Sequence, residues 1–128
     1  MSMLASCDII AFVATTDPER AREFYAGVLG LRLVDDQPAA LVFDAHGTML
    51  RIAKVQAFTP ARHTVLGWVV GNVAGVVDGL AGAGVTFERF AGLQQDDRGI
   101  WTSPDRAKIA WFKDPSGNIL SLTEFPVG

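Results

Sequence analysis

Cysteine and histidine are scarce in this sequence: its 128 residues include one cysteine, Cys7, and two histidines. One cysteine cannot form a disulfide within the chain, so a reducing compartment is the natural environment. We expect Cys7 to be a packed residue rather than a reactive thiol. Positive charge is also limited, since 11 Lys and Arg stand against 14 Asp and Glu, for a net charge of −3. Nucleic-acid binding needs a dense field of positive charge, and this balance argues against it.

Long hydrophobic runs are missing as well. No apolar stretch approaches the roughly 20 residues that a membrane-spanning helix needs, and residues 1–7 lack the basic patch and apolar run of a signal peptide. We therefore expect a cytoplasmic protein with no membrane partner. Apolar residues make up 49% of the chain and charged residues 20%, which is typical of a globular domain with one core.

The first half of the chain predicts a strand, a helix and three further strands. Residues 9–14 are strand-like, and Asp17 with Pro18 supplies a helix N-cap followed by proline at the first helical position. A helical apolar stripe then ends at Gly30, formed by Ala21, Phe24, Tyr25 and Val28. Strands are predicted at 31–34, 39–43 and 48–55, with turns at 35–38 and 44–47.

The second half repeats this order. Residues 63–70 are strand-like, Asn72 is the expected N-cap, and the apolar helical stripe that ends at Gly84 consists of Val73, Val76, Val77 and Leu80. Strands are predicted at 85–90, at 100–102 with 107–113, and at 119–125. The sequence therefore predicts an α+β fold in a single domain over 1–128, with module one at about 8–56, a linker at about 57–62 and module two at about 63–126.

Two segments carry a resemblance to a known family. Asp17-Pro18, Phe24-Tyr25 and residues 28–31 are similar to the opening of the vicinal oxygen chelate superfamily, and residues 112–120 are similar to its closing hairpin. This superfamily includes glyoxalases, bleomycin-resistance proteins and extradiol dioxygenases. The resemblance implies two tandem βαβββ modules, a curved mixed sheet with a concave ligand cleft, and a homodimer. It does not fix a function, because the fold hosts lyases, epimerases, dioxygenases, transferases and drug-binding proteins.

The closing hairpin also has a local physical explanation. Asp114 can accept backbone N–H groups across the turn, Pro115 presets φ, and Gly117 tolerates positive φ. Asp114 is therefore interpreted as a structural residue rather than a catalytic one.

Metal-dependent members of this superfamily bind a divalent ion with His, Gln or Glu side chains from four strands. By the resemblance, the ligand positions fall on Ile10, Arg51, Val65 and Ser121. Ile10 and Val65 cannot coordinate a metal, and Arg51 places a positive charge where the cation would lie. A shifted alignment would bring Asp8 and His63 to the site, and these two alone are a poor set of ligands. We therefore expect no cofactor.

The alternation of strand residues then sorts the two faces of the sheet. The face that would carry the metal is expected to line a largely apolar cleft, formed by Ile10, Phe12, Met49, Arg51, Val65, Gly67, Val69, Ile119, Ser121 and Thr123. The opposite face is expected to pack under the helices, with Ile9, Ala11, Val13, Leu50, Ile52, Leu66, Trp68, Leu120 and Leu122. Arg51 is the expected anchor for an anionic or carbonyl group, since a guanidinium can bind a carboxylate through two hydrogen bonds. An ion pair of Arg51 with Asp8 or another acid is the structural alternative.

A polar segment near the end of the chain is longer than a tight hairpin requires. Residues 92–104 combine flexible polar residues with apolar ones, which fits a loop that closes over a cleft or reaches a second subunit. Trp101 and Trp111 are candidates for stacking on a ligand, with core packing as the alternative for each.

Two functional classes follow from these observations. One is a metal-independent protein that binds a hydrophobic or amphipathic small molecule in its cleft, with no catalytic residue assigned. The other is a glyoxalase-like lyase or dioxygenase-like oxidoreductase that uses a divalent metal held by divergent ligands. A metal-free enzyme that uses Arg51 and Ser121 ranks third, because the sequence offers no convincing base.

Overall fold

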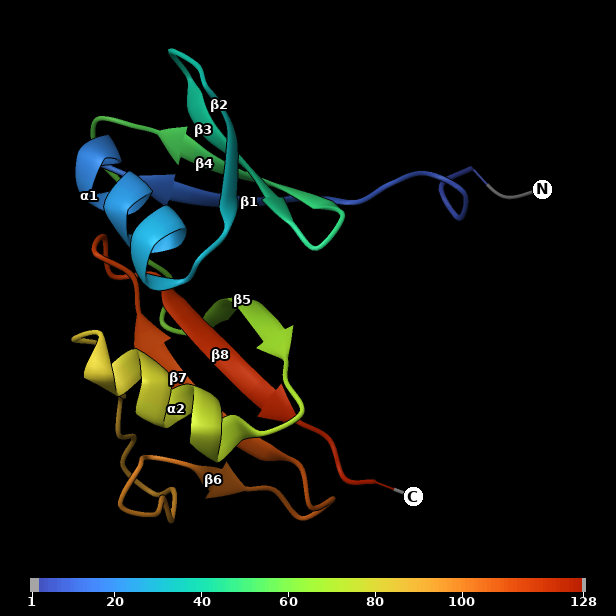
Figure 1. Cartoon of the computed structure of the whole chain (residues 1–128), viewed down its shortest axis with the longest axis vertical. Helices are drawn as coiled ribbons and strands as arrows, with labels where there is room; N and C mark the ends of the chain where they lie inside the picture. Colours follow the sequence, from blue (N-terminus) through green and yellow to red (C-terminus); the bar gives the residue numbers. More distant parts are fainter. Residues whose placement is uncertain (1–2, 128) are drawn as a thin grey trace. The chain divides into compact units, whose positions relative to one another are not determined.

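A computed structural model describes residues 3–127 of the chain and divides it into two compact units, Met1–Phe58 and Thr59–Gly128. Over the described residues each unit contains one four-stranded mixed sheet with helical structure on one face (Figure 1). The α+β prediction is confirmed. Each sheet joins one parallel pair of strands to two antiparallel pairs, as expected for a βαβββ module.

Unit 1 begins with β1 (Ile10–Thr15), followed by α1 (Pro18–Arg22) and a π-helical segment, η1 (Glu23–Val28). Three strands complete it: β2 (Arg32–Asp36), β3 (Ala40–Ala45) and β4 (Thr48–Lys54). Their order in the sheet is β1-β4-β3-β2, and β1 runs parallel to β4. β2 extends through residues 35 and 36, which the sequence assigned to a turn, because a bulge after Leu33 shifts its register against β3.

The helix of unit 1 begins and ends where its sequence predicts. The Asp17 side chain accepts a hydrogen bond from the Arg20 N–H at 3.3 Å, and Pro18 occupies the first turn. In the π-helical segment the Leu29 N–H donates to the Phe24 carbonyl at 2.9 Å. Gly30 follows with φ of +77°, a conformation in which a side chain would be strained. This geometry turns the chain from the helix into β2.

The core of unit 1 lies between the helical segments and the sheet. Tyr25 is fully buried against Phe43 of β3, with ring centroids 5.9 Å apart. Three predicted helix-facing residues, Val13, Leu50 and Ile52, are buried as expected. The prediction for Ile9 is wrong: it precedes β1 and is 77% exposed, so no strand alternation sets its direction.

Unit 2 consists of β5 (Thr64–Val69), α2 (Val73–Gly82), β6 (Trp101–Thr102), β7 (Lys108–Lys113) and β8 (Ile119–Glu124). Their order in the sheet is β5-β8-β7-β6, and β5 is parallel to β8. Asn72 caps α2 by accepting the Gly75 N–H at 3.1 Å, as predicted. Helix α2 packs over β7 and β8, where its Val73 and Val77 join a buried core that contains Ala110, Phe112, Leu120 and Leu122 (Figure 1).

One predicted strand of unit 2 is wrong. Residues 85–90 do not form a strand; they contribute a single bridge between Phe87 and Phe112 and a hydrogen bond from the Glu88 N–H to the Trp111 carbonyl at 2.8 Å. The regular edge strand beside β7 is the two-residue β6 instead. The physical reason is that a side chain, Gln95, takes the backbone hydrogen bonds that a ladder would have used.

The closing hairpin confirms the structural interpretation of Asp114. Its carboxylate accepts hydrogen bonds from the Ser116 and Asn118 N–H groups, both at 2.9 Å, and from the Asn118 side-chain amide at 2.8 Å. Gly117 has φ of +90°, as the turn requires. Asp114 is buried, and its oxygens are engaged in holding the turn.

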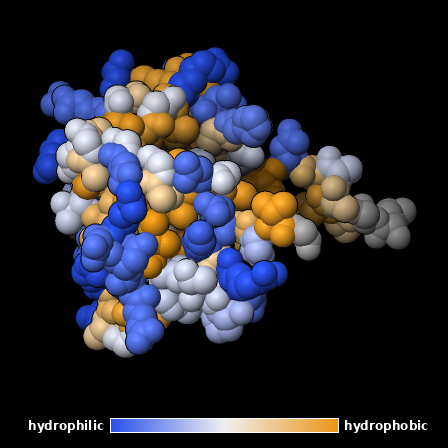
Figure 2. Space-filling view, turned by 60° about the horizontal axis from the view of Figure 1, so that its bottom comes forward, coloured by the Kyte–Doolittle hydropathy of each residue, from blue (hydrophilic) through white to orange (hydrophobic). Residues whose placement is uncertain are grey.

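The segment before β1 is largely exposed. Cys7 is a free, exposed thiol, so the prediction that it packs against the protein is wrong. Its apolar neighbours Met3 and Leu4 are exposed too, and hydrophobic side chains are visible on the surface of the segment that leads to the N-terminus (Figure 2). Among the described residues, no helix is long and apolar enough to cross a membrane.

Candidate ligand-binding faces

In unit 1 the predicted ligand residues gather on one face of the sheet, opposite the helical segments. Ile10 pairs with Met49 and Phe12 pairs with Arg51 across the parallel β1–β4 ladder, so each pair lies side by side on the same face. Ile10, Phe12 and Met49 are 45%, 61% and 41% exposed. Burial of apolar surface is the main favourable term in folding. The exposed side chains of Ile10, Phe12 and Met49 therefore form a hydrophobic surface that folding of the chain leaves uncovered.

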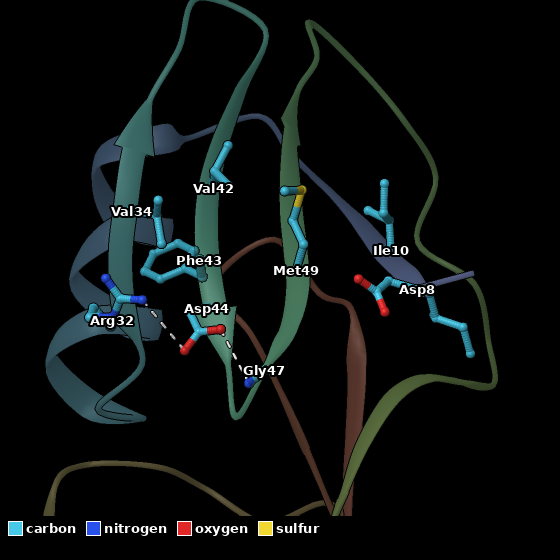
Figure 3. Close-up of a pocket in the computed structure, with 10 residues that line it drawn as sticks. Asp8, Ile10, Arg32, Val34, Val42, Phe43, Asp44, Gly47 and Met49 are labelled. Atoms are coloured by element: carbon cyan, nitrogen blue, oxygen red, sulfur yellow. Dashed lines mark hydrogen bonds and ion pairs between the residues drawn. The ribbon is translucent and has the colours of Figure 1, made fainter. Parts of the chain in front are cut away.

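A pocket of about 410 Å³ lies on this face (Figure 3). Each strand contributes one aliphatic or thioether side chain to it: Ile10 from β1, Met49 from β4, Val42 from β3 and Val34 from β2. Pockets of this size and apolar character are typical small-molecule sites. Two of the four residues, Ile10 and Met49, belong to the predicted cleft.

Charged side chains line the end of the same pocket. Arg32 and Asp44 form an ion pair at 3.7 Å, and Asp44 also accepts the Gly47 N–H at 3.2 Å (Figure 3). Asp8 contributes a second carboxylate. Arg32, Val34 and Asp44 were not predicted to line a site, because only the strands that carry the metal-ligand positions were expected to form the cleft. Strand alternation at 32–34 and 42–44 would have placed them on this face.

Arg51 is held by an amide rather than by an acid. One of its terminal nitrogens donates to the side-chain oxygen of Gln37 at 3.0 Å, and the Gln37 amide nitrogen donates to Asp35 at 3.0 Å. Among residues 3–127 Arg51 forms no ion pair, so the alternative of a structural pair with Asp8 is wrong. The guanidinium is therefore oriented without being neutralised, and its remaining donors are available to an anionic or carbonyl group.

In unit 2 the predicted residues lie on the sheet face opposite α2. Gly67, Ser121 and Trp111 are register partners across β5, β8 and β7, and the next row contains Val69, Thr123 and Ile109, which pairs with Trp101. Ser121 is only 8% exposed, and its hydroxyl lies 2.5 Å from the point that a Cβ on Gly67 would occupy. The missing side chain at Gly67 therefore leaves the room that Ser121 fills.

Val65 occupies the irregular part of β5. The register shifts between Thr64 and Leu66, which leaves Val65 without a partner in the β5–β8 ladder, and its side chain is partly exposed. Thr123 is half-buried in the row beside Val69. Val65 and Thr123, both predicted to contact ligand, therefore lie in unit 2, and Val65 contributes exposed apolar surface to it.

The two tryptophans form one aromatic cluster. The rings of Trp101 and Trp111 are tilted by 34° with centroids 6.1 Å apart, and Phe90 meets Trp111 edge to face at 5.3 Å. The Trp111 indole N–H donates to the Thr64 hydroxyl at 3.2 Å, which fixes the ring. Such pairs add stabilisation beyond area burial and create flat, rigid surfaces that suit aromatic ligands.

The segment 92–104 is anchored rather than free. Gln95 bridges to Trp101, and its side chain bonds the Phe90 N–H at 2.8 Å and the carbonyl oxygens of Glu88 and Gly99 at 2.9 and 2.7 Å. Arg98 binds Asp78 of α2 through two nitrogens, at 2.8 and 3.1 Å, and this hydrogen-bonded guanidinium holds the pKa of Asp78 below its ordinary value. These contacts attach the segment to α2 and to the residues before Gly92, and its role in closing over a cleft or reaching a second subunit stays a prediction.

The four metal-ligand positions offer one hydroxyl and no carboxylate, imidazole or thiolate. Ile10 and Val65 carry partly exposed apolar side chains, Arg51 is bound to Gln37, and Ser121 is buried. Over residues 3–127 no three His, Cys, Asp or Glu side chains are grouped closely enough to hold a metal ion. His63, the candidate from a shifted alignment, is exposed and precedes β5. This donor set does not fit the divalent ion of the metal-dependent relatives.

Comparison with known proteins gives one consistent answer for the fold. The model of the Glyoxalase/Bleomycin resistance protein/Dioxygenase superfamily matches residues 7–122. A putative glyoxalase family protein from Bacillus anthracis is similar over 98% of this chain and 100% of its own, with 19% identity and a TM-score of 0.76. TnmS3, an antibiotic binding protein from Streptomyces sp. CB03234, is 24% identical over 98% and 100%, with a TM-score of 0.74.

Lactoylglutathione lyase from Agrobacterium tumefaciens is 17% identical, over 95% of this chain and 96% of its own, with a TM-score of 0.73. No curated protein sequence matches the chain significantly. The chain belongs to the Glyoxalase/Bleomycin resistance protein/Dioxygenase superfamily, which is the vicinal oxygen chelate resemblance noted above. At these identities the solved structures establish the fold and leave the activity open.

Proposed function

We propose that this protein binds a hydrophobic or amphipathic small molecule through the exposed faces of its sheets, without a metal ion. The observation that carries this proposal is the exposed apolar surface formed by Ile10, Phe12 and Met49 on one face of the unit 1 sheet, where Ile10 and Met49 also line the pocket. Soluble proteins seldom leave such a contiguous surface without a use. The antibiotic-binding relative TnmS3 supports the same class of function.

The residues proposed to contact ligand divide between the units. In unit 1 they are Ile10, Phe12, Met49 and Arg51. In unit 2 they are Val65, Ser121, Thr123, Trp101 and Trp111. Arg51 is the polar anchor, because its amide partner leaves the charge uncompensated. A glyoxalase- or dioxygenase-like reaction would need metal ligands at Ile10, Arg51, Val65 and Ser121, and these side chains do not provide them. No catalytic residue is therefore assigned. A homodimer in the cytoplasm completes the proposal, since each four-stranded sheet has two edge strands that a partner could cover.

A thermal-shift screen over drugs and aromatic acids tests the proposal. A ligand that binds only the folded state raises the apparent melting temperature, and the shift grows with the logarithm of the ratio of ligand concentration to Kd. We expect at least one compound to do so in buffer that contains EDTA, and Phe12→Ser to abolish its shift while leaving the unliganded melting temperature nearly unchanged. Leu4→Ser is the matched control, because it removes another exposed apolar side chain, one that lies before β1 and outside the sheet face. A shift that survives Phe12→Ser, or that needs added metal, contradicts the proposal.

A further inference from the structure

A second pocket lies in unit 2, where the linker meets the closing hairpin. Its volume is about 370 Å³. The linker contributes Pro60 and Arg62, the segment before Gly92 contributes Glu88 and Phe90, and the β7–β8 hairpin contributes Lys113 and Ile119. Pro60 packs closely on the hairpin, since its ring lies 3.1 Å from the point that a Cβ on Gly117 would occupy. The linker is therefore a wall of this pocket.

An aromatic side chain forms part of the pocket wall. Phe90 lines it and meets Trp111 edge to face, and Trp111 in turn packs against Trp101. The position of Phe90 is fixed through its backbone, because its N–H donates to Gln95 while the same Gln95 amide donates to the Glu88 carbonyl. A rigid aromatic wall of this kind binds a flat ring at low cost in conformational entropy.

The residues that line the pocket also carry a net positive charge. Lys113 and Glu88 form an ion pair at 3.6 Å, which compensates one positive charge. Arg62 forms no ion pair among residues 3–127, so the three charged groups leave one net positive charge. A single net charge suits a monoanion, and a guanidinium matches the two oxygens of a carboxylate.

We propose that this pocket is a subsite for an aromatic ring that carries a carboxylate, with the ring against Phe90 and Ile119 and the carboxylate toward Arg62 and Lys113. The proposal rests on the proposed function and specifies the class of ligand. An anionic group of the ligand would then be bound by Arg62 and Lys113 in unit 2 as well as by Arg51 in unit 1. Glu88 disfavours a dianionic group such as a phosphate monoester, because the carboxylate would face the second negative charge.

Isothermal titration calorimetry with 2-naphthoate and 2-naphthamide tests the subsite, since the two probes share a ring and a shape and differ in charge. The wild-type protein is expected to bind 2-naphthoate more tightly. Arg62→Gln and Lys113→Gln are each expected to weaken 2-naphthoate by about two- to fivefold, as befits exposed charge contacts, and to leave 2-naphthamide unchanged. Phe90→Leu is expected to weaken both probes alike.

Lys108→Gln is the matched control, because it removes the same charge from the same strand outside the pocket. The subsite is overturned if the two probes bind equally, if Lys108→Gln weakens 2-naphthoate as much as Lys113→Gln does, or if neither probe binds. Equal binding that remains sensitive to Phe12→Ser removes the subsite while the proposed function stands. Failure of the drug and aromatic-acid screen removes the proposed function itself.

Discussion

Gln95 holds Phe90 in place through a hydrogen bond of 2.8 Å from the Phe90 N–H to the Gln95 side-chain oxygen. The amide nitrogen of the same side chain donates to the carbonyls of Glu88 and Gly99, so both of its N–H groups are used. One side chain therefore does what a neighbouring strand does elsewhere in the sheet, and it couples the loop after Gly92 to the aromatic cluster around Trp111.

Gln95→Leu should destabilise the protein by about 1–3 kcal/mol, because it leaves one backbone N–H and two carbonyls of the part-buried segment without their partner. Urea denaturation followed by tryptophan fluorescence measures the change. Gln94→Leu is the control, since Gln94 is the exposed neighbour of Gln95 and has no such contacts. This variant should alter stability by less than about 0.5 kcal/mol. Equal effects for the two variants would show that Gln95 does not hold the segment.

Arg51→Met keeps most of the apolar stem while removing the charge and all five donors. If the ligand carries an anionic or carbonyl group on the unit 1 face, affinity should fall about ten- to a hundredfold, the effect of losing a charge-assisted contact in a partly dry site. Stability should change little, because the structural partner of Arg51 is a neutral amide. Calorimetric titration and urea denaturation separate the two quantities, with Arg20→Met on α1 as the control.

The opposite pattern for Arg51→Met has a clear meaning. Unchanged affinity together with a loss of several kcal/mol of stability would make Arg51 a structural residue. The polar contacts to the ligand would then have to come from other residues.

Gly117→Ala should destabilise unit 2 by about 1–3 kcal/mol, since alanine is strained at positive φ and its Cβ would press on Pro60. Gly79→Ala should stabilise by about 0.5–1 kcal/mol, because Gly79 is an exposed position of α2 with open space around it. Urea denaturation of the two variants should thus give changes of opposite sign. A neutral Gly117→Ala would mean that the hairpin and linker wall are not rigid.

The features that the sequence predicted correctly depend on local chemistry. Asp17 and Asn72 cap helices because their side chains reach the backbone three residues on. Asp114 and Gly117 determine the closing turn in the same way. These interactions lie within a few residues along the chain, so their pattern can be read directly.

The features that the sequence did not predict depend on which of several possible partners a residue contacts in the folded chain. Residues 85–90 have the pattern of a strand, yet the Phe90 N–H and the Glu88 carbonyl bond the Gln95 side chain, and nothing in the pattern indicates this partner. Gln37 as the partner of Arg51 is equally invisible, since it lies in a turn 14 residues earlier. The exposure of Cys7 depends on what covers the segment before β1, which composition does not determine.

The proposed homodimer predicts sedimentation as a dimer at micromolar concentration. The exposed apolar residues before β1 and the edge strands of both sheets give a partner surfaces to cover. Analytical ultracentrifugation over a hundredfold range of concentration distinguishes a stable dimer from a monomer. A single monomeric species throughout would contradict this part of the proposal.

The metal content of the native protein tests the central claim most directly. The protein is purified without chelator and its Zn, Ni, Fe, Mn and Co are measured by elemental analysis alongside its concentration. Because Ile10, Arg51, Val65 and Ser121 occupy the ligand positions, we expect far less than one divalent ion per chain. One tightly bound divalent ion per chain, lost when Ser121 or its neighbours on β8 are replaced, would contradict the account.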